Sequence, residues 1–215
     1  MTLADHKTKS ALERLLPHVE VTGGSFSNDL PPLDQLSAKR ARLKLRAARA
    51  EARKTALTDL TDHFDSGEQY SIKETAEGYR EWPEGYTGSL THKGPILLAA
   101  VVESRFTESL GIDLEFNSEG GKGLSHVVNE GENPDHIGSK PTALGIFSTK
   151  ESIYKAYYPL MESDLGFDDV QIEWTESSAF LDRGIARCPD STEFKIQCLY
   201  LNEWIVSAAQ LEGNK

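Results

Sequence analysis

The sequence predicts an α+β fold built from two subdomains, residues 1–110 and residues 111–215. In each half, a segment of helical character is followed by short segments of strand character that are separated by turn residues. A doubly wound sheet would instead alternate single strands with helices. No repeat of about 20 to 50 residues is visible, so the two halves are not copies at the level of sequence.

The first half is expected to be mostly helical before residue 67 and mostly strand after it. Residues 3–16 form a short amphipathic segment, and a loop rich in Gly, Ser and Pro follows at residues 23–32. Residues 33–62 are rich in Ala, Leu, Arg and Lys and contain no Gly or Pro, which predicts a long helix. Residues 95–102 are an almost unbroken apolar run, which predicts a buried strand.

The second half is expected to open on a strand. Residues 111–116 alternate, with apolar side chains on one face and the two acids, Asp113 and Glu115, on the other. A polar, Gly-rich loop is expected at residues 117–141 and a helix at 147–161. Further strands are predicted at residues 170–174, 194–201 and 204–211.

Composition limits the class of protein. A chain of 215 residues with 38% hydrophobic content can bury a core. It contains no apolar run of the roughly 20 residues that a membrane helix requires, and its first residues lack a secretory pattern. We therefore expect a cytoplasmic protein with no membrane partner. Its only cysteines, Cys188 and Cys198, are expected to be reduced.

The charge distribution indicates a small anionic ligand. A net charge of −11 argues against nucleic acid as a partner. Between Lys39 and Lys54, however, eight basic residues accompany a single acid, Glu51. A basic strip on an acidic protein suits a small polyanion. A solvated helix face explains most of the strip equally well, and duplex binding through it would be steeply dependent on salt.

Asp113 and Glu115 lie two residues apart on a predicted strand, so their carboxylates project from one face. Oxygen ligands of this kind suit Mg²⁺, which keeps water and phosphate in its remaining positions. The alternative is an exposed strand face with two solvated acids, and a D-x-E pair taken alone favours that alternative.

Glu151 and Lys155 lie four residues apart on the predicted helix and share a face. Helix rules also offer a capping box from Ser148 to Glu151 and a surface ion pair between Glu151 and Lys155. The combination with the predicted strand favours a site, because Glu151 would add a third carboxylate. Lys150 and Lys155 would then neutralise a diphosphate.

Residues 88–94 combine small residues with Thr91 and His92, a composition that lets phosphate oxygens approach backbone and side-chain donors. A structural turn is the alternative. The other histidines show no metal-ligand spacing, so zinc is not expected.

Three ordered blocks resemble the 4′-phosphopantetheinyl transferases, specifically the longer single-chain type that serves nonribosomal peptide, polyketide and siderophore synthases. Residues 82–92 are similar to the family's W-P-x-G-x-x-G-S-x-T-H block, and residues 111–115 to its G-I-D-x-E strand. Residues 147–156 are similar to its F-S-x-K-E-x-x-Y-K-A helix. The resemblance continues at residues 157–160, 165–169 and 204–209.

The resemblance implies a site at the interface of two subdomains related by a pseudo-twofold axis. Asp113, Glu115 and Glu151 would hold Mg²⁺ on the diphosphate of coenzyme A. Lys150 and Lys155 would meet that diphosphate, and Thr91 and His92 the nucleotide phosphates. Further contacts are expected from the basic residues Arg49, Arg40, which is one residue out of register, and Lys73, the nearest match to a family lysine.

The implied reaction is that of a holo-[acyl-carrier-protein] synthase: transfer of the 4′-phosphopantetheine arm to a serine of an apo acyl or peptidyl carrier protein, releasing 3′,5′-ADP. Glu151 or a metal-bound water would take the serine proton, Lys155 would assist the leaving group, and Asp113 is counted with them as catalytic. A monomer is expected, and residues 117–141 are the expected border of the carrier site. The rival functions are a non-catalytic coenzyme A or nucleotide-binding protein of the same fold and a Mg²⁺-dependent phosphohydrolase.

Overall fold

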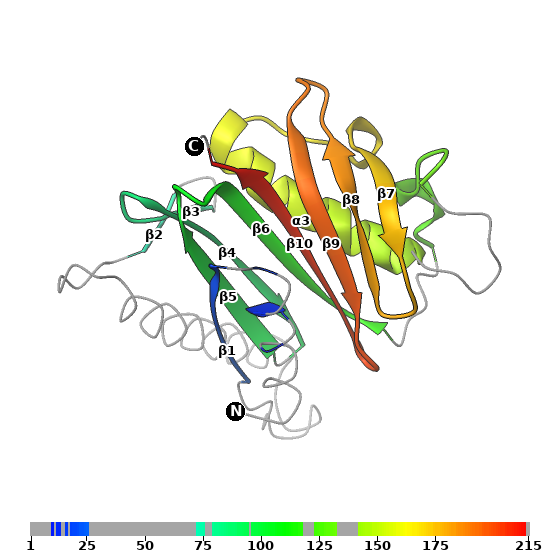
Figure 1. Cartoon of the computed structure of the whole chain (residues 1–215), viewed down its shortest axis with the longest axis horizontal. Helices are drawn as coiled ribbons and strands as arrows, with labels where there is room; N and C mark the ends of the chain where they lie inside the picture. Colours follow the sequence, from blue (N-terminus) through cyan, green and yellow to red (C-terminus); the bar gives the residue numbers. More distant parts are fainter. Residues whose placement is uncertain are drawn as a thin grey trace, which may run out of the picture.

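The structure is a computed structural model that describes residues 10, 12–13, 16, 18–25, 72–75, 79–94, 96–117, 123–132 and 142–213. The described part consists mainly of antiparallel strands and a long α-helix, with two short 3₁₀ helices, η2 (Ser125–Val127) and η3 (Phe167–Asp169). Ser10, Leu12 and Glu13 are also helical. The coarse prediction of mixed α+β structure is confirmed. Figure 1 shows the strands side by side, with the helix behind the larger sheet.

The strands form three sheets. A three-stranded sheet has the order β1-β5-β4, from β1 (Glu20–Ser25), β5 (Ile96–Glu103) and β4 (Tyr86–Lys93). A five-stranded sheet has the order β6-β10-β9-β8-β7, from β6 (Thr107–Phe116), β10 (Trp204–Glu212), β9 (Glu193–Tyr200), β8 (Leu181–Arg187) and β7 (Gln171–Ser177). A small ribbon pairs β2 (Lys73–Glu74) with β3 (Arg80–Glu81).

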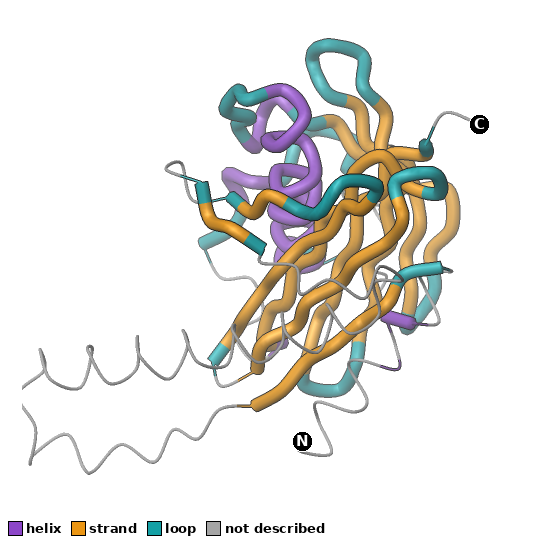
Figure 2. The backbone as a smooth tube through the Cα atoms, turned by 90° about the vertical axis from the view of Figure 1, so that its left-hand side faces the viewer, coloured by secondary structure: helices purple, strands orange, loops and turns teal. Residues whose placement is uncertain are grey.

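Helix α3 (Ala143–Met161) covers one face of the five-stranded sheet (Figure 2). It packs closely on β6 because Gly111 lies between them. A Cβ added at Gly111 would meet the carbonyl oxygen of Ser152 at 1.8 Å and the amide nitrogen of Ala156 at 2.8 Å. The glycine of the G-I-D block is therefore needed for this contact, and Ser109 reinforces it by donating to the Ala156 carbonyl at 2.6 Å.

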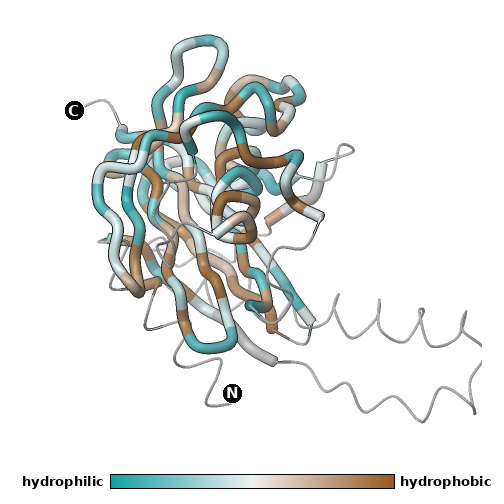
Figure 3. The backbone as a smooth tube through the Cα atoms, turned by 90° about the vertical axis from the view of Figure 1, so that its right-hand side faces the viewer, coloured by the Kyte–Doolittle hydropathy of each residue, from teal (hydrophilic) through white to brown (hydrophobic). Residues whose placement is uncertain are grey.

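Hydrophobic cores lie on both sides of β6. Ile112 and Leu114 face the core that joins the two larger sheets, where they meet residues of β5 and β10. A second core packs α3 residues such as Ile153 against β7, β8 and β9. Figure 3 shows the corresponding hydrophobic stretches along the strands, with hydrophilic residues in turns at strand ends. The other face of β6, which carries Asp113, is thereby turned toward α3.

Most predicted strands are confirmed. The apolar run at 95–102 corresponds to β5, and the alternating segment at 111–116 to β6. The segments predicted at 170–174, 194–201 and 204–211 correspond to β7, β9 and β10. Both cysteines are buried, and neither is in a disulfide.

The helix start was predicted wrongly. The helix α3 begins at Ala143 rather than at Phe147, and its N-cap is Thr142, whose hydroxyl accepts from the Gly145 amide at 3.1 Å. Ser148 lies inside the helix, so the capping box from Ser148 to Glu151 does not exist. The side-chain cap of Thr142 decided this boundary, whereas the sequence offered Ser148 as a later cap.

Three other predicted segments lie mostly or wholly outside the described residues, and a fourth expectation concerns the boundary between the two halves. Of residues 3–16 only a few are described, and the predicted helix at 33–62 lies outside the described residues, as do residues 117–141 except 117 and 123–132. The expected boundary between residues 110 and 111 falls within β6, which runs on without interruption from Thr107. The turn at residues 104–106 separates the strands of the two larger sheets.

Candidate active site

The candidate site lies where β4 of the smaller sheet meets β6 of the larger one. The two strands belong to different sheets, and side chains bridge them. The Ile112 amide donates to the Ser89 hydroxyl at 3.1 Å, and the Thr91 hydroxyl donates to Asp113 Oδ1 at 3.1 Å. We call this junction of β4 and β6 the seam. The side chains that cross it stand beside α3, so three elements meet here.

Asp113 is the centre of the site. Its buried carboxylate accepts three hydrogen bonds from side chains of β4 and α3. Thr91 and Lys155 contact Oδ1, Lys155 at 2.6 Å, while Ser148 contacts Oδ2 at 2.9 Å. The helix is fixed in turn, because Ser207 of β10 donates to the Ser148 carbonyl at 2.6 Å. Lys155 thus pairs with Asp113 rather than forming the surface ion pair with Glu151 that the helix spacing also allowed.

Glu115 occupies the same face of β6, two residues further along. Its carboxylate is 12% exposed and forms an ion pair with Lys93, at the end of β4. Burial raises the pKa of Glu115, the charge of Asp113 raises it further, and the hydrogen bond from Lys93 opposes both effects. The carboxylate therefore interacts with a neighbouring acid and a neighbouring base at once.

Glu151 faces the two acids from α3. Burial raises the pKa of its carboxyl group, and the negative charges of Asp113 and Glu115 act in the same direction. Among the described residues no hydrogen bond or ion pair reaches its side chain. The three predicted metal ligands, on α3 and on a single face of β6, are thus near enough for the charges of Asp113 and Glu115 to act on Glu151.

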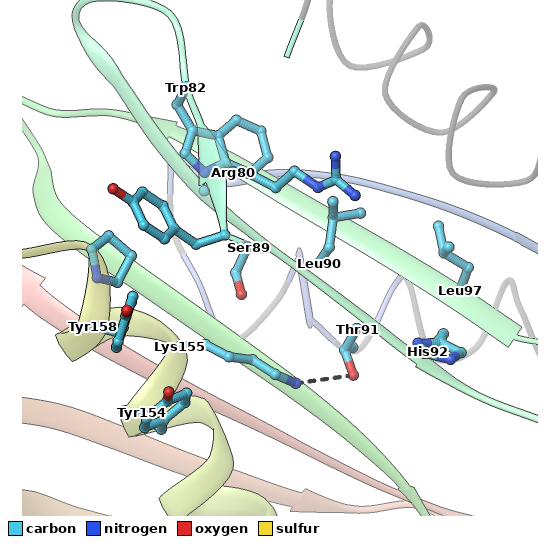
Figure 4. Close-up of a pocket in the computed structure, with 13 residues that line it drawn as sticks. Arg80, Trp82, Ser89, Leu90, Thr91, His92, Leu97, Tyr154, Lys155 and Tyr158 are labelled. Atoms are coloured by element: carbon cyan, nitrogen blue, oxygen red, sulfur yellow. Dashed lines mark hydrogen bonds between the residues drawn. The ribbon is translucent and has the colours of Figure 1, made fainter. Parts of the chain in front are cut away.

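A cavity of about 260 Å³ opens between β4 and the C-terminal part of α3 (Figure 4). Thr91, His92 and Lys155 line it, so three of the predicted phosphate contacts share one pocket. Its other walls are largely aromatic and apolar, formed by Tyr79, Arg80, Trp82, Gly88, Ser89, Leu90, Leu97, Tyr154, Tyr158 and Pro159. The Lys155 ammonium, 28% exposed, contacts the Thr91 hydroxyl at 3.4 Å within this pocket. Such a cavity can accept an organic phosphate.

Lys150, in contrast to Lys155, does not line this cavity. Its side chain is 1% exposed and forms an ion pair with Glu132 at 2.9 Å, and its ammonium also donates to the Phe167 carbonyl at 2.9 Å. Burial lowers the pKa of Lys150, and the hydrogen bond from its ammonium to Glu132 opposes that shift. In this arrangement the ammonium is enclosed, and we do not keep Lys150 among the groups that contact phosphate. Its proximity in sequence to Glu151 was misleading because adjacent helical residues point about 100° apart.

The remaining predicted contacts are not described. Arg40 and Arg49 lie outside the described residues, and only the backbone of Lys73, in β2, is described. Their roles stay predictions.

Oxygen ligands of this kind fit a hard divalent cation, since the charge of Asp113 raises the pKa of both Glu115 and Glu151, and a shared positive charge would offset that repulsion. Within the described residues, however, no group of three His, Cys, Asp or Glu side chains is already arranged to hold a metal ion. Lysine ammonium groups contact two of the three carboxylates instead. The donor chemistry fits, and the ion would have to replace these ammonium groups.

Sequence reasoning missed three residues of this region. Ser148 was visible inside the F-S-x-K-E block but was read only as a cap. Lys93 directly follows the block that ends at His92, and a cross-strand pair with Glu115 could not be foreseen without knowing that β4 and β6 are neighbours. Glu132 stands in a loop whose sequence carries no signal of burial.

Three curated proteins match the chain. PptT of Mycobacterium tuberculosis (strain ATCC 25618 / H37Rv) is 34% identical over 112 residues, 49% of this chain and 49% of that protein. Svp of Streptomyces mobaraensis is 33% identical over 102 residues, 44% of this chain and 42% of that protein. Npt of Nocardia iowensis is 32% identical over 107 residues, 48% of both chains. All three are 4′-phosphopantetheinyl transferases.

The resemblance to phosphopantetheinyl transferases that the motifs predicted is thus confirmed by these relatives. The chain spans about half the length of the relatives that it matches. No protein-family model matches it. Among the described residues, no helix is both long and apolar enough to cross a membrane.

Proposed function

We propose that the chain is a Mg²⁺-dependent 4′-phosphopantetheinyl transferase that uses coenzyme A and an apo carrier protein. The observation that carries the proposal is the pair of Asp113 with Lys155, whose side chain also lines a pocket together with Thr91 and His92. The similarity to three transferases of this name supports it. The pseudo-twofold relation of two subdomains, 1–110 and 111–215, with the site at their interface belongs to the same proposal.

The substrate is expected to enter the cavity between β4 and α3. Aromatic side chains such as Tyr154, Tyr158 and Trp82 offer apolar surface to the organic part of coenzyme A, while Thr91 and His92 offer donors to its phosphates. Lys155 stands between the pocket and Asp113, so its ammonium reaches both regions. This position suits a group that stabilises negative charge on a leaving phosphate.

The reaction is a displacement at phosphorus. The hydroxyl oxygen of a carrier serine forms a bond to the phosphorus that bears the pantetheine arm, and the bond from that phosphorus to the bridging oxygen of 3′,5′-ADP breaks. The serine proton goes to Glu151, or to a water held at the metal site. Lys155 offsets the charge that develops on the departing oxygen. Bound at the three carboxylates, Mg²⁺ would supply positive charge for the diphosphate.

The two rival functions have less support. A phosphohydrolase would use the same carboxylates, but the three similar proteins are all named as transferases. A non-catalytic binding protein would have no use for a raised-pKa carboxylate facing two further acids. The proposal is of a monomer, because both strands of the seam and α3 lie on one chain, and a cytoplasmic location belongs to the same proposal. The loop at residues 117–141 is the proposed border of the carrier site.

One experiment tests the function. The protein is incubated with coenzyme A, Mg²⁺ and purified apo carrier domains, and each carrier is weighed by mass spectrometry. We expect a gain of one phosphopantetheine group, lost when EDTA replaces Mg²⁺ and when the carrier serine is changed to alanine. An unmodified carrier accompanied by release of free phosphate would identify a phosphohydrolase. An unmodified carrier with intact coenzyme A would favour the binding protein.

A further inference from the structure

Lysine side chains contact two of the three carboxylates of the site. Lys93, on β4, pairs with Glu115, and Lys155, on α3, pairs with Asp113 at 2.6 Å. Glu151 differs from both, because no described side chain forms an ion pair with it. The two lysines come from different elements and approach from different sides, so each covers a separate carboxylate.

Lys93 is the less expected of the two. It directly follows the block of residues 82–92 on which the family resemblance rests, and it is not part of any of the three blocks. Its side chain is 40% exposed, whereas that of Glu115 is 12% exposed. The ammonium therefore reaches inward from the surface to a largely enclosed carboxylate, and it can leave toward solvent.

An ammonium and a divalent cation compete for one carboxylate. A divalent cation bound to Glu115 would lie within a few ångströms of the Lys93 ammonium, and positive charges at that separation repel each other strongly in a partly buried site. The ion therefore displaces the lysine. The carboxylates stay partly neutralised while the site holds no metal.

We propose that Lys93 is a displaceable counter-ion of Glu115, which lowers the affinity of the ligand-free chain for divalent cations. The inference rests on the proposed function, since it concerns the metal ligands of the same site. Its physical consequence is linkage: any anion that draws the Lys93 ammonium away from Glu115 strengthens metal binding, and the metal in turn favours the anion. The chain would then take up metal and diphosphate together.

A purely structural role for the same pair predicts the opposite sign. If the pair only holds the end of β4 against β6, removing the Lys93 ammonium loosens Glu115 and weakens metal binding. If the lysine is a counter-ion, removing it strengthens metal binding. The direction of the change therefore separates the two roles, whatever the effect on stability.

Mn²⁺ binding to the full chain, followed by electron paramagnetic resonance at low ionic strength without coenzyme A, measures this change. We expect Lys93→Met to bind Mn²⁺ about two- to fivefold more tightly than the wild type, the range for loss of one partly exposed ion pair. Lys93→Arg keeps the positive charge and should bind Mn²⁺ like the wild type. Lys195→Met is the matched control, because it removes an exposed pair with Glu212 far from the acids.

Equal or weaker Mn²⁺ binding by Lys93→Met overturns the proposal, as does tighter binding by Lys93→Arg or by Lys195→Met to the same degree. Absence of Mn²⁺ binding in every variant overturns it as well. Circular dichroism establishes that each variant is folded, and Lys93→Gln repeats the measurement if Lys93→Met is not. The carrier mass assay keeps the two ideas apart, since a wild-type mass gain with no Lys93 effect rejects only the counter-ion.

Discussion

At the scale of single residues, Asp113 connects the three elements of the site. Its carboxylate accepts from Thr91 on β4 and from Ser148 and Lys155 on α3, while its own backbone belongs to β6. A substitution here changes the charge of the site and the contacts of the neighbouring elements together. Isosteric changes are therefore more informative than truncation.

Asp113→Asn should reduce transfer of phosphopantetheine to the carrier by about 10²- to 10⁴-fold, the usual scale for loss of a charge-stabilising group. The amide keeps the shape of the side chain but removes the negative charge that faces Lys155. Initial rates from the mass assay at saturating Mg²⁺ measure the effect. Glu176→Gln, an exposed acid paired with Arg183, is the control and should leave the rate unchanged. Rates near the wild-type value for Asp113→Asn would remove Asp113 from the mechanism.

Glu151→Gln should raise the melting temperature of the metal-free protein at neutral pH. Burial and the charge of Asp113 raise the pKa of Glu151 above its ordinary value of 4.5. Folding therefore favours the protonated form, so the stability that Glu151 contributes is full below pH 4.5 and is lost as the pH rises through the raised pKa. The neutral amide avoids that loss.

Calorimetry in EDTA at pH 4 and at pH 7.5 measures this difference. We expect a melting temperature a few degrees higher for Glu151→Gln at pH 7.5 and little difference at pH 4, with Glu176→Gln as the exposed control. A lower melting temperature for Glu151→Gln at pH 7.5 would contradict the electrostatic picture of the three acids.

At the scale of elements, the position of α3 on β6 decides whether the site exists. Two features hold the helix in place: the close contact at Gly111 and the buried pair of Lys150 with Glu132. Glu132 also accepts from the backbone amides of Asn129 and Ile172, so it ties the loop and the edge strand β7 to the helix. Each feature carries its own prediction.

Gly111→Ala should destabilise the fold by about 3 kcal/mol or more, the upper part of the range for overpacking. The added methyl would meet backbone atoms of α3, with the Ser152 carbonyl oxygen at 1.8 Å, and the backbone cannot rotate away as a side chain could. Urea denaturation gives the free energy of unfolding. Glu108→Ala, at an exposed position of the same strand, is the control and should change it little. A Gly111→Ala protein with wild-type stability would show that α3 can move off β6 freely.

Glu132→Ala should destabilise the fold by about 3–5 kcal/mol, because it leaves the Lys150 ammonium buried without its partner. The double variant Glu132→Leu with Lys150→Met should regain most of that loss, since neither charge then remains buried. The exposed control Glu212→Ala removes the partner of Lys195 and should lose no more than about 1 kcal/mol. Similar losses in Glu132→Ala and Glu212→Ala would mean that burial of the pair contributes nothing.

At the scale of the whole molecule, the sequence predicted where the strands lie better than it predicted which strands are neighbours. Alternation at residues 111–116 and the apolar run at 95–102 identified β6 and β5, because both patterns follow directly from which faces are buried. The partner of each strand was not predictable in the same way. The junction of β4 with β6, on which the site depends, joins residues about 20 positions apart through side chains such as Ser89, and no local pattern encodes it.

The candidate site was also predictable only in part: the sequence indicated its residues but not the direction of every side chain. The family blocks named Asp113, Glu115, Glu151 and Lys155; the structure pairs Lys155 with Asp113, and the role of the three acids as metal ligands stays a prediction. Lys150 came from the same block, yet its side chain turns into the interior, where Glu132 neutralises it. Residue type and spacing on a helix indicate a face only when the helix axis has been placed against its neighbours. The roles of Arg40, Arg49 and Lys73 stay predictions because the described part of the structure does not include their side chains.

Hydroxyl groups, rather than a continuous ladder of backbone hydrogen bonds, join β4 to β6 at Ser89 and Thr91. Backbone hydrogen bonds can be formed by almost any residue type and change little when a side chain is replaced. A hydrogen bond to a side-chain hydroxyl is lost with one substitution. The stiffness of the seam therefore depends on two small side chains. Relatives that exchange them for alanine or valine would keep both sheets and yet differ in how firmly the catalytic acids are held against the pocket.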